Sequence, residues 1–302
     1  MPLATRYLDA MTSREVEFYL KDGGNLIFIP FGPVSGHGAL LPLGIHAHWA
    51  QALSQLLAER ANGLVFPPVY SCYAGATRSF RGTVSFPIAE QVAVLMRIAN
   101  TLCDQGFRRT VLVGGTTPES TGGAVAAREL SDRTERPIWF VEAARALDLP
   151  EIRALYEGYP GNFGETLIGL ASLKIIGRER PIPLADWARE LKPDATLRTS
   201  KAPSQSSIDN DGDQPAEIFP DVVALRRWGQ IGFRYHEERN HGNHGTAGLE
   251  FQGRLDLDLA VEVLEKSADA LLPALDSLTR YADWLDTKPF RYIEATERLE
   301  ER

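Results

Sequence analysis

Histidine is the residue type of this chain that points most directly to chemistry. The 302 residues contain six histidines, and imidazole binds divalent metals and transfers protons near neutral pH. The six fall into two groups, which are His37, His46 and His48 near the N-terminus and His236, His241 and His244 further on. Because a metal needs three or four converging nitrogen or oxygen donors, the grouping predicts one pocket lined by both groups.

Each of these histidines also has a structural interpretation, and the alternatives stay open. In a glycine-rich turn, His37 can simply hydrogen-bond to the backbone, and His46, at a predicted helix start, can lie at the surface. We expect His48 to be structural. The second group can form a solvated loop in which the charged residues 237–239 pair with one another, which contributes little to stability.

Serine chemistry has weaker support. Ser35 lies two residues before His37, but no Gly-x-Ser-x-Gly nucleophile elbow surrounds it. The sequence also contains no phosphate-binding loop and no dinucleotide-binding fingerprint. We therefore do not expect a serine nucleophile or a nucleotide cofactor.

A strand, a turn and a helix must position the first group of histidines. Residues 26–30 form an apolar run that is typical of a buried strand. A turn rich in glycine and proline follows. A helical pattern then begins near His46 and ends at Ala61, with Asn62 and Gly63 as its C-cap. In open α/β sheets, ligands bind at such strand ends.

The rest of the chain alternates between strands and helices. We expect further strands at residues 64–69, 109–114, 137–141 and 229–235, and helices at residues 13–20, 88–105, 121–130, 164–175 and 255–285. Strands separated by helices of this length form parallel βαβ units with right-handed crossovers. The sequence thus predicts an α/β protein with one domain over residues 1–302, a mostly parallel sheet and helices on both faces.

Two stretches are less regular. Residues 70–86 are rich in glycine and aromatic residues, and we expect a lid or pocket wall there. Residues 178–220 are polar and rich in proline and serine, which predicts irregular structure. Within them, the acidic run at 209–213 hints at a calcium loop. Its glycine is misplaced and no glutamate closes it, so a solvated turn is favoured.

Composition excludes several classes of function. A net charge of −8 leaves no basic footprint for nucleic acid. No apolar run is long enough to span a membrane, and the first residues lack a signal-peptide core. The two cysteines, Cys72 and Cys103, are too few for a disulfide scaffold. We therefore expect a cytoplasmic protein whose partner is a small molecule.

The turn at residues 32–46 resembles a stretch of the creatininase (creatinine amidohydrolase) family. That family reads roughly Gly-Ser-x-Glu-Gln-His-Gly-Pro-His-Leu-Pro-Leu-Gly-Thr-Asp, and this chain keeps much of the frame together with His37. Weaker pieces of resemblance lie at residues 80–85, 105–113, 161–166 and 242–253. The resemblance covers most of residues 13–275 and implies a creatininase-like architecture.

The same resemblance implies a metal site, but an altered one. In the family, the glutamate, the first histidine and the aspartate of this stretch hold a pair of divalent ions, and a later histidine is a further ligand. The matching residues here are Ser35, His37, His46 and Thr116, so three of the four differ. Glu119 lies one position past an acidic ligand, where it also suits a helix start. We expect one Zn²⁺ or Mn²⁺ ion per chain or none, held by His37, His46 and Glu119.

The activity that the resemblance implies is hydrolysis of a small ring. We expect a metal-assisted hydrolase that opens the C–N bond of a cyclic amide, with Glu165 and His241 as catalytic residues. Opening of a ring at a C–C bond stays an alternative within the family. A second hypothesis is a metal-free homologue, either a non-catalytic subunit or a small-molecule-binding protein. The resemblance also implies a homo-oligomer, a hexamer.

Overall fold

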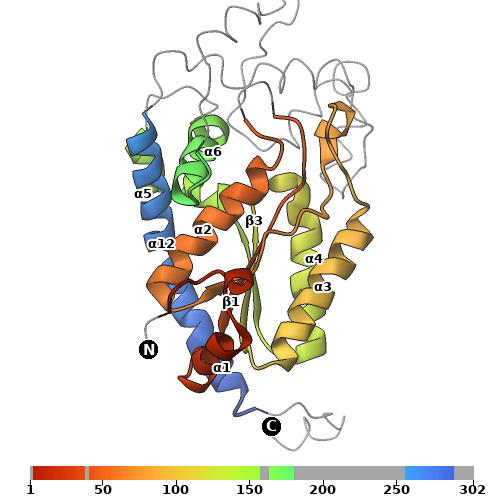
Figure 1. The fold of residues 1–302 in the computed structure, drawn as a ribbon, viewed down its shortest axis with the longest axis vertical. Coiled ribbons are helices and arrows are strands. Elements are labelled where there is room, and N and C mark those ends of the chain that lie inside the picture. Colours follow the sequence, from red (N-terminus) through yellow and green to blue (C-terminus); the bar gives the residue numbers. More distant parts are fainter. Residues whose placement is uncertain (1–2, 38–40, 157–162, 180–255, 289–302) are drawn as a thin grey trace, which may run out of the picture.

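The computed structural model describes residues 3–37, 41–156, 163–179 and 256–288 (Figure 1). Its centre is a sheet of four parallel strands in the order β2-β1-β3-β4. These strands are β1 (Leu26–Phe31), β2 (Leu64–Val65), β3 (Arg109–Gly114) and β4 (Ile138–Glu142). Within the described part of the chain, every strand pairing in this sheet is parallel, so the predicted parallel sheet is confirmed.

Helices cover both faces of this sheet (Figure 1). They are α1 (Ser13–Lys21), α2 (Ile45–Ala61), α3 (Ile88–Asp104), α4 (Thr117–Thr134), α5 (Pro150–Arg153), α6 (Phe163–Ile175) and α12 (Leu257–Leu285). Short 3-10 turns are η1 (Leu8–Ala10), η2 (Gly75–Ser79), η3 (Ala143–Asp148) and η4 (Ala154–Tyr156). Helices α2, α6 and α12 pack on one face, and α1, α3 and α4 pack on the other.

Strand β1 explains why both faces are covered. All six of its residues are buried. Since successive side chains of a strand point to opposite faces, Leu26 and Phe28 enter the core under α2, whereas Ile27 and Ile29 enter the core under α3. A strand that is apolar on both faces therefore needs helices on both, which is the predicted α/β arrangement.

The helix boundaries follow from local signals. Thr12 caps α1 through a capping box with Glu15, in which each side chain accepts from the other residue's backbone N–H. Asn62 ends α2 in the left-handed conformation, as a C-cap does. The start of α1 at Ser13 and the C-cap of α2 were predicted from the residue types alone.

Two elements differ from the prediction. Helix α4 begins at Thr117 rather than at residue 121, since Pro118 lies in its first turn, where a proline is tolerated. Its two early glycines pack closely against neighbouring side chains. A Cβ at Gly123 would lie 2.6 Å from ring atoms of both Phe31 and Phe140. Strand β2 ends at Val65 rather than at residue 69, since the two prolines that follow at 67 and 68 have no N–H for the ladder. The predicted strand at 229–235 and the acidic run at 209–213 lie outside the described residues.

The last helix packs against helices that are distant from it in the sequence. Helix α12 contacts α2 and α6, and it buries Val263, Leu264 and Leu275 against them. Arg60 of α2 donates to Asp269 of α12 at 2.7 Å. The predicted helical tail is therefore an integral layer of the fold.

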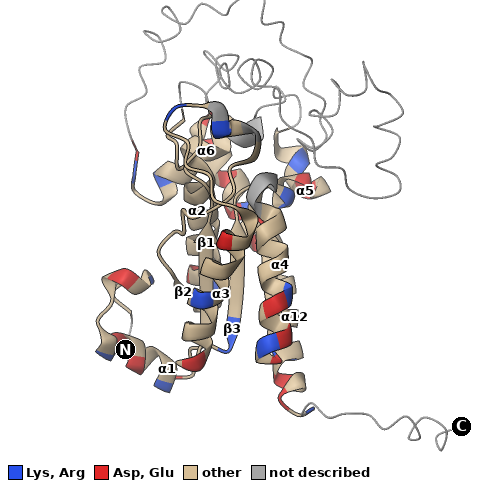
Figure 2. Ribbon diagram, turned by 90° about the vertical axis from the view of Figure 1, so that its right-hand side faces the viewer, with Lys and Arg blue, Asp and Glu red and all other residues tan. Residues whose placement is uncertain are grey.

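Charged residues lie mainly on the helices rather than on the strands (Figure 2). None of the described helices is long and apolar enough to cross a membrane.

Candidate functional site

The turn after β1 presents the first group of histidines at the carboxyl edge of the sheet. Ser35 N–H donates to the Leu43 carbonyl at 2.8 Å, which closes the turn on itself. Gly32 allows the start of α2 to approach the end of β1, because a Cβ there would lie 2.5 Å from the backbone nitrogen of Ala47. The close approach buries His46 in the first turn of α2.

His37 and His46 form a packed pair of imidazoles. Their ring centroids lie 4.1 Å apart, with the rings inclined by 58°. His37 is 1% exposed and His46 is 5% exposed. The structure therefore brings together two of the three residues predicted as metal ligands, although neither histidine lies at the surface.

Hydrogen bonds orient both rings. His37 Nδ1 lies 2.9 Å from the carbonyl oxygen of Ser35, so we assign the proton to Nδ1, which leaves a lone pair on Nε2. The Thr116 hydroxyl lies 2.9 Å from His46 Nδ1. Thr116 comes from the loop after β3, which is next to β1 in the sheet. We call Ser35, His37, His46 and Thr116 the imidazole cluster.

The predicted pocket wall packs against this cluster. The backbone N–H of Gly36 donates to the Thr83 hydroxyl at 3.0 Å, and Val84 N–H donates to the Val34 carbonyl at 2.8 Å. A Cβ at Gly36 would lie 2.5 Å from Cβ of Phe80. The connection between β2 and α3 thus lies directly beside the turn that carries His37.

His48 belongs to a different environment. Its Nε2 lies 3.3 Å from Nη1 of Arg178 and 3.4 Å from the Tyr70 hydroxyl. Because arginine only donates, Nε2 accepts and Nδ1 carries the proton; Nδ1 is buried and meets no acceptor among the described residues. Burial lowers the pKa of His48 to about 4, and the nearby Arg178 charge acts in the same direction. The ring is therefore a neutral, structural partner, as expected.

Sequence reasoning missed one buried acid at this edge of the sheet. Glu142 ends β4, is 8% exposed, and accepts from Arg145 Nε at 3.1 Å. Gly114 at the end of β3 pairs with it in the strand register. The available signal was an acidic residue placed directly after the apolar run of residues 138–141.

The side chains of three predicted site residues are not among the described ones, so their roles stay predictions. The backbone of Glu119 lies in the first turn of α4, and that of Glu165 lies in the first turn of α6. His241 lies outside the described residues with the rest of the second group. Helix α4 starts at the carboxyl edge, and α6 packs on α2, which carries His46.

The donors of the imidazole cluster fit a pair of divalent ions poorly. They comprise two imidazoles and two hydroxyls, whereas zinc sites use three or four nitrogen, sulfur or carboxylate ligands. Across the described residues, no group of three or more histidine, cysteine, aspartate or glutamate side chains is arranged to hold a metal. The described side chains of the cluster therefore do not form a paired metal site on their own.

A parallel sheet covered on both faces, with buried polar side chains gathered after β1 and β3, defines an α/β protein whose candidate site lies at the carboxyl edge. The family model described as creatininase, creatinine amidohydrolase, matches residues 9–204, well over half of the chain. The chain therefore belongs to the creatininase family. Among curated proteins, none matches it at a significant level.

Solved creatininase structures have the same fold. A structure named Creatininase Mn has a TM-score of 0.59 and 21% identity, and the match covers 88% of this chain and 97% of that one. A creatininase variant complexed with creatine also has a TM-score of 0.59, with 20% identity over 88% of this chain and 97% of that one. A putative creatinine amidohydrolase from Bacteroides fragilis NCTC 9343 has a TM-score of 0.50 and 16% identity, over 87% of this chain and 96% of that one.

Proposed function

We propose that the imidazole cluster is the site of a creatininase-like hydrolase that opens a small cyclic amide or a related ring compound. The observation that carries this proposal is the buried pair of His37 and His46 at 4.1 Å, at the carboxyl edge of a parallel sheet. Buried basic groups at this edge are uncommon unless they meet a ligand or each other.

His37 supplies the base in this proposal. Its Nδ1 proton is held by the Ser35 carbonyl, so Nε2 can accept a proton from water. The water oxygen then adds to the ring carbonyl carbon, the C–N bond breaks, and the ring nitrogen takes the proton. We propose that His46, which contacts Thr116 at 2.9 Å, hydrogen-bonds the reacting ring. Glu165 and His241 are the further catalytic residues that we propose.

The proposal includes at most one divalent ion per chain. Among the solved relatives, one is named for Mn and another is of Zn-Zn type. Because His37 Nδ1 carries the proton, Nε2 would either act as the base or bind the ion. In the ion-bound form, His37 and His46 would be two ligands, and Glu119 is the proposed third. Ser35 and Thr116 offer hydroxyls, which are weaker ligands for a second ion than carboxylate or imidazole.

A second candidate is a metal-free binding protein on the same scaffold. It is favoured by the way in which the cluster pairs its own polar groups, since Thr116 contacts His46 and the Ser35 carbonyl accepts from His37. Such a site can hold a small polar ring by hydrogen bonds without reacting with it.

One set of measurements separates the two candidates. Untagged protein is incubated with creatinine, five- and six-membered lactams and hydantoins; NMR follows ring opening, and calorimetry measures binding. The hydrolase predicts turnover that falls at least about 100-fold in His37→Ala. Turnover should be unchanged in Arg128→Gln, an exposed site on α4. Binding without turnover supports the second candidate, and neither binding nor turnover contradicts both.

Metal content tests the proposal of at most one divalent ion per chain. Elemental analysis of the same untagged protein should give no more than one divalent ion per chain, and His37→Ala should lower that content. Two tightly bound ions per chain would contradict the assignment of the ligands.

We also propose that the protein is cytoplasmic, because its two cysteines are too few for a disulfide scaffold. We propose a homohexamer on the basis of family resemblance. Light scattering coupled to size-exclusion chromatography measures the assembly directly. A monomer over the working concentration range would contradict the hexamer without affecting the assignment of the site.

A further inference from the structure

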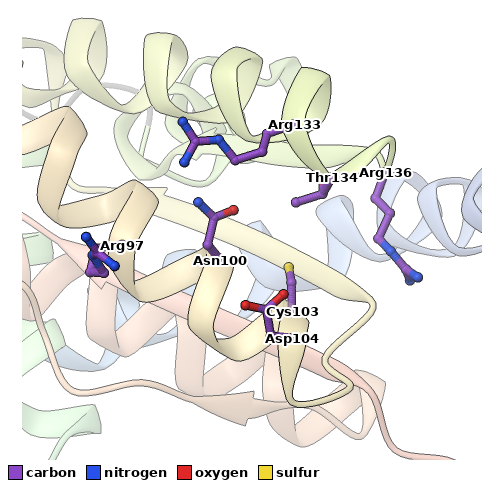
Figure 3. A pocket seen from close by; sticks show the side chains of 7 residues that line it. All are labelled: Arg97, Asn100, Cys103, Asp104, Arg133, Thr134 and Arg136. Carbon is purple, nitrogen blue, oxygen red and sulfur yellow. The ribbon is translucent and has the colours of Figure 1, made fainter.

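A second polar site lies between α3 and α4. It is a groove of about 470 Å³ formed by the C-terminal halves of both helices and the residues that lead into β4 (Figure 3). Arg97 and Asn100 line it from α3, and Arg133 lines it from α4. Its volume is within the range of pockets that hold small molecules.

This groove is separate from the imidazole cluster. Helices α3 and α4 both end where β3 and β4 begin, at the amino edge of the sheet. The cluster lies at the carboxyl edge, after the last residues of β1 and β3. The full length of β3 therefore separates the two edges. A ligand of the groove does not touch the histidines.

The groove is positively charged in a chain whose net charge is −8. Three arginines, Arg97, Arg133 and Arg136, surround it, against one acid, Asp104. Within the described part of the chain, none of the three guanidinium groups makes an ion pair. Arg128, on the same helix as Arg133, instead pairs with Asp132 at 3.2 Å. The groove arginines thus keep their donors for another partner.

Helix ends offset only part of this positive charge. The carbonyl ends of α3 and α4 each carry about half a negative charge, and Arg133 in the last turn of α4 suits that end. The thiol of Cys103 adds no negative charge at neutral pH, because burial raises its pKa. The arginines outnumber these negative groups, so a cationic groove remains.

The arrangement of side chains indicates what kind of anion fits. Arg97, Asn100 and Cys103 follow one another at intervals of three residues along α3, so they form a stripe on one side of the helix. Figure 3 shows the Asn100 amide directed toward the side of the groove where Arg133 lies, and the Cys103 sulfur directed toward Thr134. Guanidinium donors match the oxygens of phosphate and carboxylate, and an amide can bind a neighbouring polar group.

We propose that this groove binds a small molecule through a phosphate or carboxylate group, held by Arg97 and Arg133 with Arg136 at the other end. The carboxylate of Asp104 repels a bound anion, so a variant at this position predicts the direction in which affinity changes. Replacing it with asparagine removes a repulsive charge without changing its size, so an anion should bind more tightly and a cation less tightly.

Calorimetry tests the proposal with two probes, inorganic pyrophosphate and glutarate, at constant ionic strength. We expect at least one probe to bind, with a Kd of about 1 mM or lower. Binding should weaken at least about 10-fold in the double variant Arg97→Gln, Arg133→Gln. It should tighten about threefold in Asp104→Asn. Arg128→Gln is the matched control, and it should leave Kd unchanged. The tighter probe identifies phosphate or carboxylate as the preferred group.

Several results would overturn the proposal. They are no binding of either probe, weaker binding in Asp104→Asn, and equal weakening in Arg128→Gln, which would indicate diffuse charge. A loss of binding in His37→Ala would place the anion in the imidazole cluster instead. If the double variant does not fold, Asp104→Asn still shows whether removing a negative charge tightens binding. This variant should fold, because Asp104 is exposed at the end of α3. This test does not depend on the hydrolase activity.

Discussion

Hydrogen bonds orient the two buried imidazoles at the carboxyl edge of this protein. Around His37 and His46, the groups that orient the rings include a backbone carbonyl and a threonine hydroxyl. Such partners set the tautomer of an imidazole without supplying charge. The rings can therefore exchange protons or bind a polar ligand. Binding of the proposed divalent ion would also need the carboxylate of Glu119 as a third ligand.

His48 makes the stability of this protein depend on pH. Its pKa is about 4 in the folded protein and 6.5 as a free side chain. Between these values the unfolded chain binds a proton that the folded protein does not, so the free energy of unfolding decreases as the pH falls through this window. Part of the shift comes from Arg178, which is exposed, so its charge is screened by solvent. We expect a loss of about 2 kcal/mol over the window and none above it.

Urea unfolding at pH 7 and at pH 4.5 measures this effect. His48→Gln is the matched variant, because glutamine is polar but does not titrate. It should lower the difference in unfolding free energy between the two pH values by about 2 kcal/mol. An unchanged pH dependence in His48→Gln would show that other groups cause it.

At the scale of elements, two glycines decide where helix α2 begins. Gly32 lies against the backbone nitrogen of Ala47, and a Cβ at Gly115 would collide with the carbonyl oxygen of His46. Both contacts are with backbone atoms, which cannot move away by changing a rotamer. The distance between Thr116 and His46 therefore depends on the absence of a side chain next to Thr116.

Gly115→Ala should push the start of α2 away from β3. We expect a loss of about 2 kcal/mol in unfolding free energy, from overpacking. NMR of the imidazole nitrogens should report that the His46 bond to Thr116 is lost. Gly177→Ala is the control, because Gly177 has a φ of +66° but nothing within 4 Å of an added Cβ. It should cost about 1 kcal/mol and leave the His46 signals in place. Identical His46 spectra in both variants would contradict this account.

At the scale of the whole molecule, α12 completes a core that begins near the N-terminus. Its buried side chains pack with Leu53 and Leu57 of α2 and with Ile168 of α6. The matched region of the family model ends at residue 204, before α12 begins. The stability of the matched region should therefore depend on a helix outside it.

A chain that ends at residue 204 should not unfold cooperatively. It lacks Val263, Leu264 and Leu275, which α12 buries. We expect each such side chain to contribute roughly 2 kcal/mol through its burial. Their combined loss is a large part of the small net stability of a typical domain.

Thermal unfolding followed by circular dichroism measures this outcome. A chain that ends at residue 288 keeps all described elements, and it should unfold as the full chain does. A melting temperature within about 5 °C of the full chain for the shorter piece would contradict the prediction.

The sequence by itself determined most of the described elements of this protein and their order. Residues 109–114 were predicted as a strand with the observed limits, and the predicted helix at 46–61 differs from α2 by one residue. Apolar periodicity, caps and glycine stops act over a few neighbouring residues, so they can be read locally. The alternation of strands and helices also predicted the parallel sheet, and with it a site at the carboxyl edge.

Only the tertiary structure decided which side chains meet. Thr116 and His46 are 70 residues apart, yet they hydrogen-bond because β1 and β3 are neighbours in the sheet. Arg97 and Arg133 share a groove because α3 and α4 end side by side on the same face. No local pattern encodes such contacts. They depend on the order of the strands, on the face to which each helix crosses, and on how closely glycines let the backbones approach, and these are properties of the packed chain.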